Sequence, residues 1–121
     1  MHRVKQFCRA FLIVGLLSCA SSAWADYAAI AYSESTGCYG YAYGCGSLEE
    51  ATAAALNNCR GRDAYVVVWV EDGYVALALG DRPNAVGWAF STNCRADAEL
   101  LALQNAHDCE ARIAASIYSG R

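Results

Sequence analysis

The chain has 121 residues, and its first 25 carry three of the nine basic residues and none of the twelve acidic ones. Residues 26–121 therefore contain six Arg, no Lys and twelve Asp or Glu, a formal charge of −6. Binding to nucleic acid or to an anionic membrane surface needs clustered positive charge, so this balance disfavours both. The length suits one domain with a modest core.

The N-terminus has the pattern of an export signal. Basic residues Arg3, Lys5 and Arg9 precede an apolar stretch at 10–17, and a small-x-small site follows at 23–25. We therefore expect a signal peptide over residues 1–25, cleaved after Ala25, and a periplasmic or secreted product. The apolar stretch is shorter than the roughly 20 residues of a transmembrane helix, and no later segment provides one.

A second reading of the same region stays open. Leu16-Leu17-Ser18-Cys19 resembles a bacterial lipobox, in which the Cys becomes the acylated first residue. On this alternative the protein is an envelope lipoprotein anchored through Cys19.

The first half of the remaining chain predicts two strands, a helix and a third strand. Residues 27–33 and 38–44 are β-rich and are separated by a turn-forming cluster, which predicts a hairpin. A capping box from Ser47 to Glu50 starts a helix that runs to about Cys59. Residues 65–71 form a strand that is apolar on both faces, which is typical of an interior strand.

The second half repeats this order at a distance of 47 residues. The segment from Tyr27 matches the segment from Tyr74, and Asp72-Gly73 before it predicts a tight hairpin. We expect strands at 74–79 and 85–91, a helix from about Cys94 to Asp108 that is about a turn longer than the first, and a strand at 111–118. The predicted units therefore span about 27–71 and 74–118 of a single domain, 26–121.

The predicted fold is α+β: a duplicated ββαβ unit that forms a six-stranded, mostly antiparallel sheet, open or closed on itself, with two parallel helices on one face. In the second strand of each unit, small residues alternate with larger ones. Small residues permit close approach, so we expect the helices on that face. The larger side chains then form either core or an exposed platform for a partner; the aromatic ones among them, Tyr39, Tyr41, Tyr43, Trp88 and Phe90, are the candidate partner-binding residues.

Five of the seven Cys residues lie outside the predicted signal. An exported domain rich in Cys is normally bridged, and the ends of one strand or one helix are too far apart to be joined. If the helices are parallel, Cys45 meets Cys94 at one end of the domain and Cys59 meets Cys109 at the other. These are the two predicted bridges, and Cys38 is left as a free thiol.

The sequence has few residues that point to catalysis. His107 is the one His after residue 25, no paired Cys spacing suggests zinc, and no nucleophile elbow or phosphate-binding loop occurs. We expect no metal and no cofactor. An enzyme that uses Cys38 or His107 remains the catalytic alternative.

The run from Tyr27 to Ser33, the segment Tyr39-Gly40-Tyr41, the Ala-rich helix ending at Cys59 and the strand Val66-Val67-Val68-Trp69 together resemble one family of small exported bacterial proteins. This is domain-of-unknown-function family 4189. The resemblance covers nearly all of residues 26–79 and, more loosely, the second half, and it implies export and this fold, but no catalytic residue.

These observations favour an exported domain, stabilised by disulfides, that works by binding another protein, as an inhibitor, an immunity-like factor or a secreted effector. The alternatives are the small secreted enzyme and the structural envelope lipoprotein.

Overall fold

The computed structural model describes residues 25–82 and 84–120. The predicted export signal and lipobox fall on residues outside these ranges, apart from Ala25. In chain order the elements are β1 (Tyr27–Tyr32), β2 (Tyr39–Cys45), α2 (Leu48–Asn57), β3 (Tyr65–Glu71), β4 (Gly73–Leu79), β5 (Val86–Ser91), α3 (Arg95–Asn105) and β6 (Arg112–Ser119). All eight lie where the sequence predicts them, within a few residues at each end.

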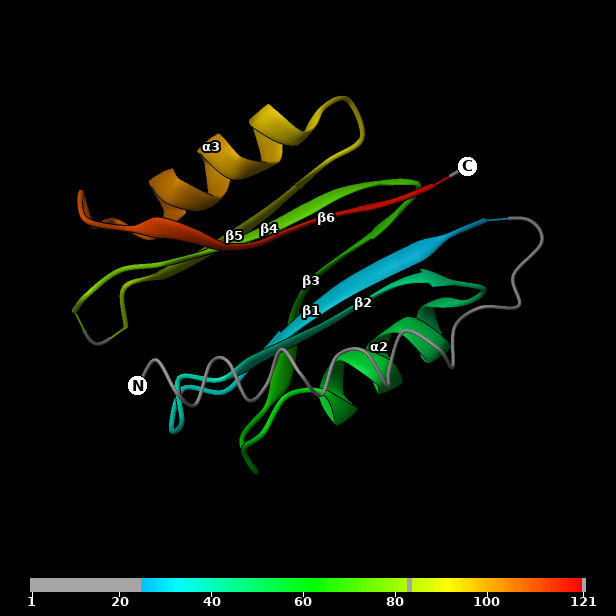
Figure 1. The fold of residues 1–121 in the computed structure, drawn as a ribbon, viewed down its shortest axis with the longest axis horizontal. Coiled ribbons are helices and arrows are strands. Elements are labelled where there is room, and N and C mark those ends of the chain that lie inside the picture. Colours follow the sequence, from blue (N-terminus) through cyan, green and yellow to red (C-terminus); the bar gives the residue numbers. More distant parts are fainter. Residues whose placement is uncertain (1–24, 83, 121) are drawn as a thin grey trace.

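The strands form two antiparallel three-stranded sheets, ordered β2-β1-β3 and β5-β4-β6. Figure 1 shows the sheets stacked face to face, with α2 outside one and α3 outside the other. The α+β class is thus correct, whereas the single six-stranded sheet with both helices on one face is wrong. The arrangement has four layers, α-β-β-α, because each sheet has two apolar faces to bury.

The error lies at Asp72. The sequence predicts a hairpin there, but β3 pairs with β1 and β4 pairs with β5 and β6, so β3 and β4 belong to different sheets. Asp72, with φ of 53°, is the one residue between them and carries the chain from one sheet to the other. As a result β3, predicted to be interior, is an edge strand.

The helices pack on the small-residue faces of the strands, as predicted. A Cβ added to Gly40 would lie 2.6 Å from the carbonyl oxygen of Ala55 in α2, and one added to Gly87 would lie within 2.5 Å of the Ala102 carbonyl oxygen in α3. Helix and strand backbones are therefore in direct contact at both glycines, which only a residue without a side chain allows.

The two halves make the same contacts 47 residues apart. Ile30 pairs with Tyr41 as Leu77 pairs with Trp88. The third strand of each half has its register shift at the matching place, opposite Ile30/Ala31 and opposite Leu77/Ala78. The helices are 10 and 11 residues long, so the expected extra turn in the second is absent.

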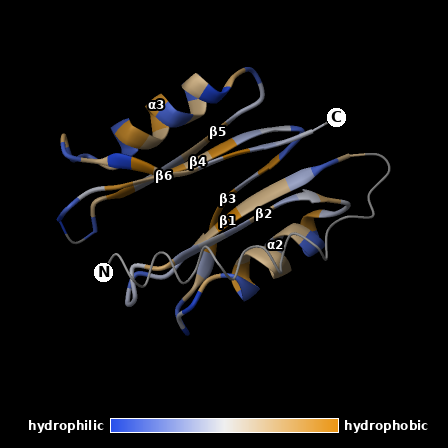
Figure 2. Ribbon diagram, viewed as in Figure 1, coloured by the Kyte–Doolittle hydropathy of each residue, from blue (hydrophilic) through white to orange (hydrophobic). Residues whose placement is uncertain are grey.

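Between the sheets lies the largest buried cluster. It includes Ile30, Val68, Val75, Leu77 and Ile117, all at most 7% exposed. Two smaller clusters, rich in Ala, fill the space between each sheet and its helix. In Figure 2 the strands are mostly white to orange, and many of the blue, hydrophilic residues lie in the connecting loops.

Neither predicted disulfide forms. Cys59, Cys94 and Cys109 are free thiols, so the pairs Cys45–Cys94 and Cys59–Cys109 do not exist in this structure. The reason is the layering: two sheets, roughly 10 Å apart, separate the ends of α2 from those of α3, whereas a bridge needs Cα atoms within roughly 7 Å. The prediction of a free thiol at Cys38 is wrong too, because Cys38 is not a free thiol here.

Candidate functional site: an apolar groove between β3 and β5

The stacked sheets have two lateral sides, and one of them is held closed by hydrogen bonds. On the side formed by β2 and β6, the Tyr39 hydroxyl donates to the Ala114 carbonyl oxygen at 3.1 Å. The Gly44 amide donates to the Ser119 hydroxyl at 3.0 Å. These contacts join the two edge strands across the interface.

The opposite side, formed by β3 and β5, has no such hydrogen bond among the described residues, and a groove of about 630 Å³ lies there. Its volume is within the range of small-ligand sites. The groove is lined by Val67, Val68, Trp69, Val70, Glu71, Trp88, Ala89, Phe90, Thr92, Leu101 and Asn105. Glu71 is its one ionisable residue.

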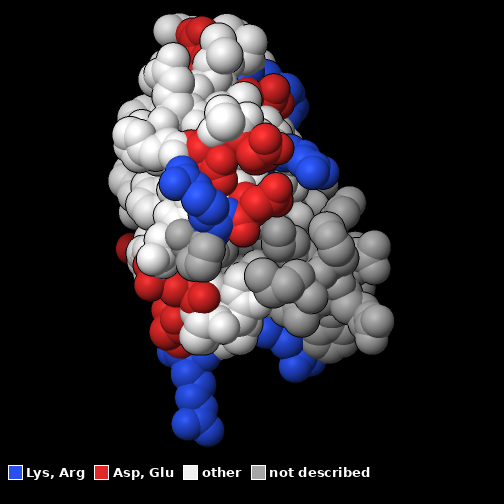
Figure 3. All heavy atoms as spheres, turned by 90° about the vertical axis from the view of Figure 1, so that its left-hand side faces the viewer, with Lys and Arg blue, Asp and Glu red and all other residues white. Residues whose placement is uncertain are grey.

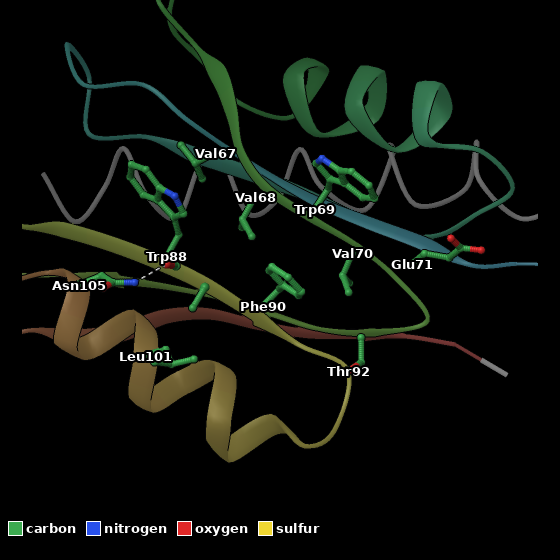
Figure 4. Close-up of a pocket in the computed structure, with 11 residues that line it drawn as sticks. Val67, Val68, Trp69, Val70, Glu71, Trp88, Phe90, Thr92, Leu101 and Asn105 are labelled. Carbon is green, nitrogen blue, oxygen red and sulfur yellow. Dashed lines mark hydrogen bonds between the residues drawn. The ribbon is translucent and has the colours of Figure 1, made fainter.

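Two elements supply the apolar walls, as Figure 4 shows. Val68 and Val70 of β3 point toward the Phe90 ring of β5, and Trp69 points to the other side of β3, as the alternation of a strand requires. Leu101 of α3 also lines the groove and lies on the other side of the β5 ribbon from the Phe90 ring. Among the described strands β3 pairs with β1 alone, and the groove runs along the other edge of β3.

Three large apolar side chains of the groove are open to solvent: Phe90 is 55% exposed, Trp69 47% and Leu101 44%. Leu100, on the same helix and 58% exposed, extends this apolar surface next to Phe90. Exposed apolar patches rimmed by polar residues commonly mark interaction sites.

The positions 47 residues away on the closed side carry different chemistry. Ser116 stands where Trp69 stands in the first half, and Ala54 where Leu101 stands in the second. Ser116 is tied to α3, because its hydroxyl donates to a Glu99 carboxylate oxygen at 2.6 Å and accepts from Arg95 at 2.8 Å. At these two matching positions, the closed side therefore has a hydrogen-bonded Ser and a small buried Ala, and the open side has two large, partly exposed apolar side chains.

The structure divides the five aromatic residues predicted to bind a partner between opposite sides. Trp88 and Phe90 line the groove, whereas Tyr39, Tyr41 and Tyr43 belong to β2 on the closed side. Tyr39 is buried between the sheets, and Tyr43 is 41% exposed. Sequence reasoning missed both Trp69, which was assigned to an interior strand, and Leu101, which was given no role.

The residues of the catalytic alternative are not brought together. Cys38 is fully buried in the cluster beneath α2. His107 is exposed just after α3, on the far side of both sheets, and its carbonyl oxygen accepts a hydrogen bond from Arg82 at 2.6 Å.

A Ser–Asp cluster holds two loops together at one end of the molecule. The Asp63 carboxylate accepts hydrogen bonds from the Ser33 hydroxyl at 2.6 Å, the Ser35 hydroxyl at 2.8 Å and the Ser35 amide at 3.0 Å. These bonds, that from Ser33 foremost, lower the pKa of Asp63 to about 2. Both hydroxyls donate to the same oxygen, so the cluster closes the loop rather than activating a nucleophile.

On the face seen in Figure 3, charges of both signs are mixed. At the end of the molecule seen in Figure 3, Lys or Arg side chains lie beside Asp and Glu side chains. One ion pair of the described residues joins Arg82 to Asp108 at 3.6 Å. Within the described ranges, no group of three or more His, Cys, Asp or Glu residues is placed to hold a metal ion.

The sequence of this framework matches a family model over residues 27–118, described as a domain of unknown function, DUF4189. The chain belongs to this family. The DUF4189 match spans both halves and so includes β3, β5 and α3, the elements of the groove. Searches among curated proteins and among solved structures find no match.

No helix in the described part of this DUF4189 protein is long and apolar enough to cross a membrane.

Proposed function

We propose that this DUF4189 protein is an exported binding module that captures an apolar segment of another protein in the groove between β3 and β5. The observation that carries the proposal is the exposure of Trp69, Phe90 and Leu101 around one groove. Aromatic side chains dominate the energy of protein interfaces, because each buries a large area with few rotatable bonds.

The comparison of the two sides supports this choice of site. Both sides are built from equivalent strands, yet one is joined by hydrogen bonds and the other presents apolar side chains to solvent. Trp69 contributes to folding through its contact with the Tyr27 ring, at 6.5 Å between centroids, but folding alone gives no reason to leave about half of the Trp69 and Phe90 surfaces exposed. Binding of a partner in the groove explains why these rings are exposed.

Export is part of the proposal and is based on the pattern of residues 1–25. We also propose that the two halves arose by duplication. The support is the 47-residue correspondence of strand pairs, register shifts and helix contacts. On this proposal the two sides were once equivalent, and the residues of the β3/β5 side have since diverged from those of the β2/β6 side.

Site-specific photocrosslinking in the exporting host tests the proposal. A photoreactive amino acid at position 90 should crosslink one protein, whereas the same group at position 43 should not. Tyr43 is the matched control because it lies 47 residues before Phe90 and is 41% exposed against 55%.

The crosslinked protein is then purified and titrated against variants. Phe90→Asp should abolish measurable binding, and Tyr43→Asp should leave the dissociation constant within a factor of two. Equal crosslinking from both positions, or binding that survives Phe90→Asp, would contradict the proposal.

A further inference from the structure

The groove offers a strand edge as well as apolar side chains. Five consecutive residues, Val67 to Glu71, line it, although successive side chains of a strand point to opposite faces. Because side chains from both faces of β3 line the groove, the main chain of β3 itself must border it. Among the described strands β3 pairs with β1 alone, so the N–H and C=O groups on its outer edge have no strand partner.

The two edges that border the groove differ in how open they are. On β5, the Asn105 side chain donates to the Trp88 carbonyl oxygen at 3.0 Å and so occupies that edge (Figure 4). On β3, the register with β1 is regular from Val68 to Glu71, and the shift comes only before Val68. The regular stretch of β3 is therefore the edge available for pairing.

The size of the groove decides between a slender occupant and a second globular copy. If each ring presents about 150–250 Å² when fully exposed, Trp69 and Phe90 at 47% and 55% exposure offer roughly 200 Å² between them. A stable protein interface buries about 800 Å² on each partner. An extended segment suits an area of this size, whereas a stable dimer interface buries several times as much surface on each partner.

The one carboxylate of the groove indicates where the ligand carries a positive charge. Glu71 is the single ionisable residue of the lining and lies at the end of β3, on the same face as Trp69. A cation on the ligand face next to Trp69 and Glu71 pairs with this carboxylate.

We propose, building on the function proposed above, that the ligand is an extended segment that adds to β3 as a fourth strand of that sheet. Its main chain pairs with Val68–Glu71. Alternate apolar side chains lie over Phe90 and Leu101, and a Lys or Arg on the opposite face meets Glu71. Strand addition of this kind obtains affinity from main-chain hydrogen bonds and specificity from alternate side chains.

A designed peptide tests the pairing. The probe is acetyl-Val-Thr-Val-Lys-Val-amide, whose three Val share one face, titrated into the isotope-labelled exported protein and followed by NMR. We expect contacts between peptide α protons and backbone protons of residues 68–71, and slower hydrogen exchange of amides there.

N-methylated versions of the peptide separate main-chain pairing from simple apolar binding. Methylation of the amides on the side that faces β3 should weaken binding about tenfold for each hydrogen bond lost, and methylation of the alternate amides should change it less than twofold. Exchange of the peptide Lys for Glu should weaken binding to the native protein but not to the Glu71→Gln variant.

Several results would overturn the inference. They are equal losses from both methylated series, backbone contacts to β5 instead of β3, absence of peptide binding, or a concentration-dependent dimer in which two β3 edges pair. If position 90 still crosslinks a partner in any of these cases, the binding function stands and strand addition alone fails. If neither the peptide nor a partner is captured, both proposals fail.

Discussion

Asn105 donates its side-chain amide to the carbonyl oxygen of Trp88 at 3.0 Å, and 47 residues earlier Asn58 donates in the same way to Tyr41 at 3.3 Å. Each Asn follows or ends its helix and ties the helix to the outer strand of its own sheet. The two contacts differ in environment, because Asn58 is buried and Asn105 is exposed.

That difference predicts unequal costs for the same substitution. Asn58→Ala should lower the free energy of unfolding by about 1–2 kcal/mol, since it leaves buried polar groups of the strand unpaired. Asn105→Ala should change it by less than about 0.5 kcal/mol, because water replaces the lost donor. Urea unfolding of both variants measures this, and equal losses would contradict it.

The close contacts at the glycines predict a strong effect of one methyl group. Gly40→Ala and Gly87→Ala should each cost about 3 kcal/mol or more, because the new Cβ meets helix backbone, which cannot move aside. Gly44→Ala is the control: nothing lies within 4 Å, and φ of +71° alone should cost about 1 kcal/mol. Thermal and urea unfolding compare the three. A mild effect at both Gly40 and Gly87 would mean that the helices pack differently.

The Ser–Asp cluster predicts a stability loss in acid. The pKa of Asp63 is lowered to about 2 in the folded chain, below the ordinary value near 3.9 in the unfolded chain. The stabilisation is therefore complete above about pH 4 and is lost as the pH falls toward 2. Asp63→Asn should flatten the dependence of the unfolding free energy on pH in this window.

The pKa of Asp108 is also lowered, chiefly by the hydrogen bond from the Glu110 amide. Protonation of Asp108 in acid should therefore also lower the free energy of unfolding. Asp108→Asn therefore serves as the comparison, and the double variant should flatten the profile further. A profile unchanged by Asp63→Asn would show that the cluster does not hold its loops together in solution.

The free thiols should react at different rates. Cys94 and Cys109 are exposed, whereas Cys59 is buried and burial raises its pKa to about 11. Because only the thiolate reacts, iodoacetamide at pH 8 should label Cys94 and Cys109 first and Cys59 only on unfolding. Non-reducing peptide mapping gives the answer, and a peptide containing Cys45 joined to Cys94 would contradict the structure.

The local pattern of the sequence predicts the elements well, and it fails where pairing between distant strands decides. Alternation, the capping box at Ser47 and the small residues of β2 and β5 place the strands, the first helix start and the helix-facing side correctly. Asp72-Gly73 carries a hairpin signal, but whether two strands pair or part at such a link depends on which faces remain to be buried. Both faces of β1 and β4 are apolar, so these central strands need a helix on one side and a second sheet on the other.

The candidate site follows from the same error. The run Val66–Trp69 has the composition of an interior strand, and with that assignment Trp69 belongs to the core. Placed at an edge, the identical residues form an exposed apolar border. Composition does not distinguish the two cases, since the strand's position in the sheet is set by its partners. Of the groove's large apolar residues, the aromatic pattern of β5 anticipated Trp88 and Phe90.

The single residue that links β3 to β4 also shapes the groove. The two peptide units that join Glu71 to Gly73 span at most about 7 Å between Cα atoms, less than the roughly 10 Å between stacked sheets. The sheets therefore converge beside Asp72, and a Cβ added to Gly73 of β4 would lie 2.8 Å from a side-chain carbon of Val70 in β3. We expect the groove to be a wedge that is narrow at Glu71 and wide at Val67. A bound segment longer than the groove can then extend beyond it only at the wide end, past Val67. We therefore expect a terminus of the bound segment to lie at the narrow end, near Glu71.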